Sequence, residues 1–259
     1  MSEQTGLSRR KFLVGAGVAA GAVAAAGAGL LKPKIAEAAY VALPWPYAAL
    51  DLAVVKRRGY ENYYIGGCMY GTGAALVQTL VETIGGAWDS IPQDLFKYGA
   101  GGINSWGATC GSIHAAAWII QACAGANVTN VINDLYQWYC NFAFPSRDHD
   151  AYAVYTRQKT TVSNSPLCHA SASNWSFTTR NKINSAQRKD RCAKVAGDVA
   201  GKTADLLNVL FAGGYVPAFV QPDPACSGCH VGATSTYDHV QMKSTCTAKC
   251  HTDKTTGHY

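Results

Sequence analysis

The chain has 259 residues, of which 48% are hydrophobic and only 15% are charged, and its formal net charge is +6. This composition excludes an intrinsically disordered protein, because enough apolar side chains are present to build a core. The length allows one sizeable domain or two small ones.

Residues 1–38 have the features of an export signal. The letters SRRKFL at residues 8–13 resemble the consensus of a twin-arginine signal. An apolar run rich in Ala and Gly follows, and Ala-Glu-Ala at residues 36–38 has the small-x-small pattern of a cleavage site. We therefore predict export by the twin-arginine route to the periplasm or another extracytoplasmic space. An uncleaved membrane anchor is the alternative.

Removal of this signal would change the charge balance. Residues 1–38 contain five of the 22 Lys and Arg and two of the 16 Asp and Glu, so the remaining chain has a net charge of +3. No basic stripe remains to indicate nucleic acid binding, and no later segment is apolar for long enough to span a membrane. Because the twin-arginine route carries folded proteins, often with a cofactor already inserted, the signal favours a metal or redox centre.

The next segment, residues 39–216, is predicted to be a helical body. Apolar periodicity indicates four helices, within residues 71–88, 109–125, 127–144 and 197–214. Pro145 ends the third of these and the pair Gly213-Gly214 ends the fourth. Residues 146–190 are polar, and we expect loops there with one short helix at most. The predicted fold class is mainly α, a helical body with an irregular C-terminal tail.

The tail, residues 217–259, begins with a proline-rich linker and contains the sequence CSGCH at residues 226–230. C-x-x-C-H is the attachment signature of c-type haem. The thiols of Cys226 and Cys229 would form thioethers to the haem vinyl groups, which places His230 under the iron as the proximal ligand.

A second unit, CTAKCH at residues 246–251, has the rarer C-x-x-x-C-H spacing. It would attach another haem through Cys246 and Cys250, with His251 as proximal ligand, so we predict two haems c per chain. Structural zinc and disulfides are the alternatives, since the spacings suit zinc and an exported protein permits disulfides. Neither alternative explains why a histidine directly follows each pair.

Two more histidines follow the proximal ones. His239 lies nine residues after His230, and His258 lies seven residues after His251. Both are candidate distal ligands, and bis-histidine ligation implies a lower potential than His/Met ligation. The alternative is that both are ordinary exposed histidines.

The body contains six more cysteines. Cys110 stands at the predicted start of a helix, where the helix dipole stabilises a thiolate and suits a metal ligand or redox thiol. Cys123 is thirteen residues further on and points to nearly the opposite helix face. Cys140 lies in a strongly apolar segment, so we expect both Cys123 and Cys140 to be buried structural cysteines.

The order of the other four cysteines resembles a known family. A lone cysteine, Cys68, precedes G-x-x-C-G at residues 107–111, and two separated cysteines, Cys168 and Cys192, follow. This order is similar to the C-GCAxxG-C-C redox family, and the added pair of haem motifs resembles the split-Soret cytochromes c. The sequence departs from the family pattern in having GATCGSIHA where GCAxxG is expected.

The resemblance implies a mostly helical subunit with an iron–sulfur cluster in the body and two c-type haems at one end. Its candidate cluster ligands are Cys68, Cys110, Cys168 and Cys192. It also implies a homodimer whose four haems gather at the interface. Disulfides or plain buried thiols are the alternatives for these cysteines.

Three histidines of the body are weaker candidates for binding a haem or a metal. His114 lies four residues after Cys110 on one helical face, and we expect a hydrogen-bonded core histidine there. His149 and His169 are further candidates for a haem ligand supplied by another subunit.

Together these features predict an exported electron-transfer multihaem cytochrome that exchanges electrons with redox partner proteins. We favour a carrier over an enzyme and assign no catalytic residue. The alternatives are a haem oxidoreductase acting on a small oxyanion or peroxide, and a secreted protein stapled by zinc or disulfides.

Overall fold

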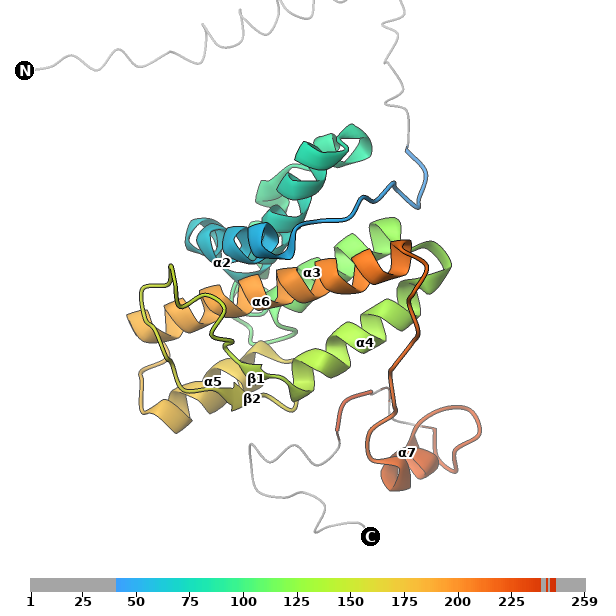
Figure 1. Cartoon of the computed structure of the whole chain (residues 1–259). Helices are drawn as coiled ribbons and strands as arrows, with labels where there is room; N and C mark the ends of the chain where they lie inside the picture. The colour runs from blue at the N-terminus through green and yellow to red at the C-terminus, as the bar shows by residue number, and fades with distance from the viewer. Residues whose placement is uncertain (1–40, 239–240, 242, 246–259) are drawn as a thin grey trace, which may run out of the picture. The chain divides into compact units, whose positions relative to one another are not determined.

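A computed structural model of the protein describes residues 41–238, 241 and 243–245. The α-helices are α2 (Leu52–Thr83), α3 (Gly111–Cys123), α4 (Val128–Asn141), α5 (Cys168–Thr179), α6 (Ala186–Phe211) and α7 (Pro224–His230) (Figure 1). Short 3-10 helices occupy Gly86–Ser90, Gln93–Gly99 and Gly125–Asn127. The strands in this part of the chain are β1 (Ala143–Phe144) and β2 (Thr161–Val162), which pair antiparallel. The prediction of a mainly helical fold is confirmed.

Helix α2 begins at Leu52, well before the predicted start at residue 71. Its N-cap is Asp51, whose carboxylate accepts hydrogen bonds from the backbone N–H groups of Ala53 and Val54 at 2.8 and 3.2 Å. The helix is interrupted at Gly67, whose φ of 82° lies outside the helical region. This kink separates an outer segment from the buried segment that starts at Cys68.

Helix α6 also begins earlier than expected, at Ala186 instead of residue 197, and Ser185 caps it by accepting a hydrogen bond from Arg188 N at 3.2 Å. It packs closely against α2. A Cβ atom built on Gly59 would lie only 2.7 Å from the Cα of Gly197, so there is no room for a side chain between the two helices. The two helices therefore touch backbone to backbone. This contact fixes the position of Cys192 relative to Cys68.

A side chain placed at this contact between α2 and α6 should lower the stability of the protein. We expect Gly59→Val to lower the free energy of unfolding by about 2 kcal/mol, since overpacking a core typically costs 1–3 kcal/mol. Gly214→Val is the matched control, because a Cβ there would meet Val209 Cγ1 at an ordinary 3.8 Å. Thermal denaturation followed by circular dichroism measures both, and equal midpoints for the two variants would contradict the close approach.

The core lies between α2, α3, α4 and α6. Fully buried side chains from these helices include Leu76, Ile113, Leu135 and Val199. Most residues of α3 are small or apolar and buried, so the residue before this helix, Cys110, is held inside the molecule. The core thus fixes the inner end of α3.

The polar segment 146–190 contains one complete helix, α5, as predicted, and strand β2, which pairs with β1 just before the segment. Its last five residues belong to α6, which the prediction of loops did not include. Among the described residues, no helix is long and apolar enough to cross a membrane.

The chain after α6 runs along α4. Tyr215 donates a hydrogen bond to Asp134 Oδ2 at 2.6 Å, and Val220 N donates to Gln137 Oε1 at 3.0 Å. Pro224 lies in the proline-rich segment that was predicted to be a linker, but it is the first residue of α7. Proline is compatible with the first turn of a helix.

Candidate functional site

Four cysteines from four helical elements line one small cavity. Cys68 follows the kink of α2, Cys110 is the N-cap of α3, Cys168 is the first residue of α5, and Cys192 lies in the N-terminal half of α6. The cavity has a volume of about 20 Å³, room for roughly one water molecule. These are the four cysteines that the sequence order singled out, and the fold brings them together.

Two hydrogen bonds hold the starts of α3 and α5 side by side. Cys110 N donates to Pro166 O at 2.8 Å, and Cys168 N donates to Ala108 O at 2.7 Å. Thr109 and Leu167 form an isolated antiparallel bridge between these bonds. Two thiols therefore stand at helix N-termini, where the helix dipole favours negative charge.

Gly111 explains why a glycine follows Cys110. A Cβ atom at this position would lie 2.4 Å from Gly99 O and 2.8 Å from the Cys68 sulfur. Any larger residue would push α3 away from α2. The glycine thus allows Cys68 and Cys110 to share one cavity.

The thiols differ in their protonation. The pKa of Cys110 is lowered to about 6, chiefly by a hydrogen bond from Cys68, then by Tyr139, the backbone N–H of Ser112 and the charge of Arg191, although burial opposes the shift. The same hydrogen bond, together with burial, raises the pKa of Cys68 well above its usual range. Without a metal, the site therefore favours a thiolate at Cys110 and a neutral thiol at Cys68.

Two arginines of α6 approach the fourth cysteine. The Arg191 side chain is 1% exposed, its Nη1 lies 3.9 Å from the Cys192 sulfur, and its Nη2 donates to Ser171 Oγ at 2.9 Å. Arg188 Nη1 lies 4.0 Å from the same sulfur. Two guanidinium groups therefore bring positive charge to the Cys192 side of the cavity, although burial raises the pKa of Cys168 to about 12.

The donor set fits a thiolate-bound iron centre. All four cysteines are free thiols, and sulfur ligands are those that iron–sulfur clusters use. Over the part of the chain that the structure describes, no group of three or more His, Cys, Asp or Glu side chains is arranged so that it could hold a metal ion.

The other two body cysteines lie elsewhere. Cys123 is buried and its thiol donates to Ile119 O at 3.2 Å, as expected of a structural cysteine. The expectation for Cys140 is wrong, because its side chain is only partly buried and lines a pocket next to the tail. The apolar neighbours of Cys140 in sequence face the core, whereas Cys140 faces this pocket.

The three body histidines do not join the cysteine cavity. His149 is fully buried, with Nδ1 2.8 Å from the Tyr152 hydroxyl and Nε2 2.8 Å from Asp198 Oδ1, so its ring cannot ligate a haem of another subunit. His114 is half-buried, and its Nδ1 makes no hydrogen bond to the described residues, contrary to the prediction. His169 is exposed.

The first haem motif forms a helix of its own. Cys226, Cys229 and His230 all belong to α7, where the spacings i, i+3 and i+4 place them on one face. Both thiols are free, and the His230 ring stacks on Tyr237 with the ring centroids 5.4 Å apart. Cys246, Cys250, His251, His239 and His258 lie outside the described residues, so their roles stay predictions.

A hydrogen bond joins two residues that precede the two haem motifs in the sequence. Thr245 directly precedes Cys246, and its hydroxyl donates to Asp223 Oδ2 at 2.6 Å. Asp223 is the N-cap residue of α7. The approach to the second motif is therefore held close to the first.

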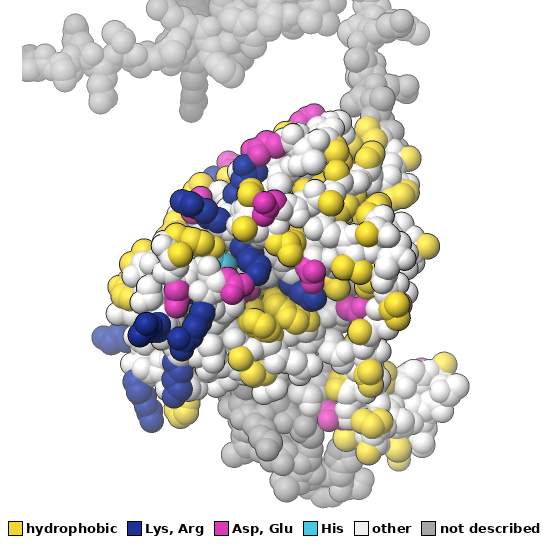
Figure 2. Space-filling view, viewed as in Figure 1, with side chains coloured by type: hydrophobic (Ala, Val, Ile, Leu, Met, Phe, Trp, Pro, Cys, Tyr) yellow, Lys and Arg dark blue, Asp and Glu magenta, His cyan; other side chains and the backbone are white. Residues whose placement is uncertain are grey.

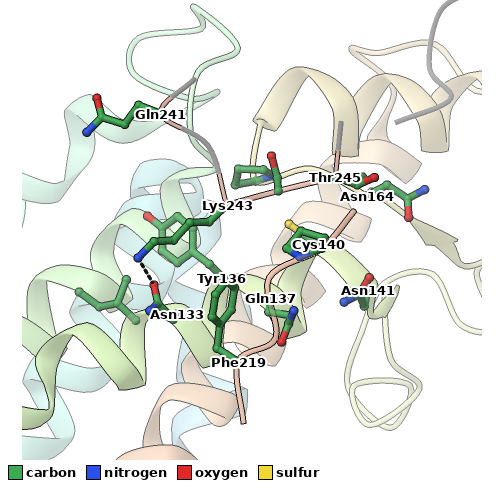
Figure 3. Close-up of a pocket in the computed structure, with 14 residues that line it drawn as sticks. Asn133, Tyr136, Gln137, Cys140, Asn141, Asn164, Phe219, Gln241, Lys243 and Thr245 are labelled. Atoms are coloured by element: carbon green, nitrogen blue, oxygen red, sulfur yellow. Dashed lines mark hydrogen bonds between the residues drawn. The ribbon is translucent and has the colours of Figure 1, made fainter. Parts of the chain in front are cut away.

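Next to this junction lies a pocket of about 380 Å³ between α4 and the tail (Figure 3). Tyr136, Cys140 and Phe219 supply apolar surface, and Lys243 reaches across to donate a hydrogen bond to Asn133 Oδ1 at 3.1 Å. Sequence reasoning did not find this pocket. Its only signal in the sequence is the run of aromatic residues around Cys140, which fits a buried helix equally well.

The fold and the four-cysteine site define a class of protein. Residues 72–206, more than half of the chain, match the family described as putative redox-active protein (C_GCAxxG_C_C), and the chain belongs to this family. The matched region contains Cys110, Cys168 and Cys192 and begins four residues after Cys68.

The chain is also similar to the split-Soret cytochrome c of Desulfovibrio desulfuricans, with 28% identity over 228 residues that cover 84% of this chain and 82% of the relative. A solved structure of that protein, described as containing a novel iron centre, matches the fold with a TM-score of 0.74 at 24% identity. It covers 83% of this chain and 93% of the other.

Proposed function

We propose that this protein is an exported electron-transfer cytochrome that carries two covalent haems c and an iron–sulfur cluster in each chain. One observation carries the proposal: four cysteines that are distant in sequence line a single cavity. The name of the similar cytochrome and the iron centre in its structural description support the same assignment.

In the body, the thiolates of Cys68, Cys110, Cys168 and Cys192 would hold the cluster, which supplies a one-electron redox centre when bound. The chain's own contribution is positioning and shielding. Cys68 and Cys110 are buried, so they keep water from one side of the site. The N-termini of α3 and α5 and the arginines of α6 stabilise negative charge there.

In the tail, Cys226 and Cys229 would anchor one haem with His230 as its proximal ligand. Cys246, Cys250 and His251 would do the same for the second haem. The Asp223–Thr245 hydrogen bond and the neighbouring apolar pocket support a close pair of haems with shielded faces. His239 and His258 are the proposed distal ligands, supplied within the chain or across a homodimer.

Redox partner proteins would dock from outside. Lys and Arg gather on the surface where α5 ends and α6 begins (Figure 2). The exposed residues of this stretch include Arg180, Lys182 and Lys189. A basic surface favours a partner with an acidic face, because complementary charges speed association.

Absorption spectroscopy with metal counting tests the proposal. The purified protein should show a Soret band, a sharp α band on reduction and two haems per chain by pyridine haemochrome. Its iron content should exceed that of the haems. Absence of a Soret band would refute the haem assignment. A high-spin spectrum that changes with cyanide or carbon monoxide would indicate a haem oxidoreductase instead.

A further inference from the structure

Arg191 is a buried cation that has no carboxylate partner among the described residues. Its side chain is 1% exposed, and none of the ion pairs formed in this part of the chain includes it. Its guanidinium group donates to the Ser171 hydroxyl and approaches the Cys192 sulfur at 3.9 Å. A neutral hydroxyl cannot balance its charge.

Arginine keeps its proton in proteins, so Arg191 cannot escape burial by becoming neutral. A buried, uncompensated charge is strongly unfavourable unless an opposite charge lies beside it. The groups that share the cavity with Arg191 are the four cysteines, two serines, Tyr139 and two apolar residues. The compensating negative charge must therefore come from the sulfurs and whatever they bind.

Two buried donors at the cavity complete no hydrogen bond of ordinary geometry, Arg191 Nε and the Tyr139 hydroxyl. The Tyr139 hydroxyl lies close enough to the Cys110 sulfur to favour its thiolate. Tyr139 comes from α4 and its side chain is fully buried, whereas Arg191 comes from α6. Two buried donors that complete no ordinary hydrogen bond at one cavity indicate that the sulfurs, or a group bound to them, are the acceptors, because each unmade bond is costly.

We propose that Arg191 and Tyr139 are positioning residues that direct their N–H and O–H groups at the sulfur-bound centre held by the four cysteines. This inference rests on the proposed function. A fixed positive charge favours the reduced form of a centre that gains one negative charge from an incoming electron. Arg191 therefore raises the reduction potential of this centre, and Tyr139 acts in the same direction to a smaller extent.

Redox titration of the holoprotein, followed by electron paramagnetic resonance of the non-haem signal, tests this. Arg191→Met should lower the midpoint enough to change the ratio of reduced to oxidised centre at least tenfold, about 59 mV for one electron. Arg191→Lys should recover part of that shift. The haem midpoints provide an internal reference, and Arg57→Met, an exposed arginine paired with Glu61, is the matched control.

An unchanged midpoint in Arg191→Met with the non-haem iron retained would overturn the inference. Loss of that iron in Arg191→Met but not in Arg191→Lys would support it, since the two variants differ in charge. If neither accumulates, Tyr139→Phe decides: a negative shift supports the inference and an unchanged midpoint and signal refute it. A wild-type protein without non-haem iron would instead refute the proposed function itself.

Discussion

Cys110→Ser is expected to abolish the proposed iron binding in the body, while both proposed haems stay attached. Cys110 is the buried thiol at which the site concentrates negative charge, because Cys68, Tyr139, Ser112 and Arg191 all favour its thiolate. A serine hydroxyl stays protonated at neutral pH and cannot replace that thiolate. Total iron should therefore fall to the level of the haems, about two atoms per chain, while the reduced α band stays unchanged.

Cys123→Ser is the control for this variant. Cys123 stands at the other end of α3, is 2% exposed and makes a hydrogen bond to its own helix, away from the cavity. This change should leave the iron content at the wild-type value, with at most a modest loss of stability. Equal iron loss in both variants, or full retention in Cys110→Ser, would show that the four cysteines do not form the iron site.

The candidate site was more predictable than the helices that build it. The order of Cys68, Cys110, Cys168 and Cys192 resembles the pattern of a known family, and that resemblance grouped the four cysteines before the fold was known. Whether they bind metal cannot be read from that grouping. The iron content of Cys110→Ser, compared with that of Cys123→Ser, decides whether these cysteines bind metal.

The helix boundaries were less accessible to sequence reasoning. Residues 52–70 carry polar and aromatic side chains without a clean apolar period, yet they form the first part of α2. What holds them helical is tertiary: the backbone contact of Gly59 with Gly197. Such a contact leaves no periodic signal, and the same reason explains why α6 was predicted too short.

Arg191 could not have been located from its sequence neighbours. It stands in the stretch KDRC, where a charged residue is ordinarily expected at the surface. Only the packing of α6 against α4 and α5 turns it inward to the cavity. Cys140 shows the opposite error, since an apolar sequence context suggested burial in the core and the structure places it at a pocket beside the tail.

The double variant Cys226→Ala/Cys229→Ala should lose one of the two proposed covalent haems and keep the proposed body iron. Both thiols belong to α7, on the face that also carries His230, and nothing else on that helix can form a thioether. Haem staining after denaturing electrophoresis and the pyridine haemochrome should each fall to about half of the wild-type value per chain. The non-haem signal should persist, because its proposed cysteine ligands lie in α2, α5 and α6 and at the N-cap of α3, outside the tail.

Ser227→Ala is the matched control, since it alters the same helix between the two cysteines without touching the C-x-x-C-H spacing. Its haem content should stay at the wild-type value. An unchanged haem content in the double variant would mean that residues 226–230 do not anchor haem. Loss of all haem together with the body iron would mean that the two centres do not form independently. Selective loss of one haem is the outcome that separates the tail from the body as two redox sites in one chain.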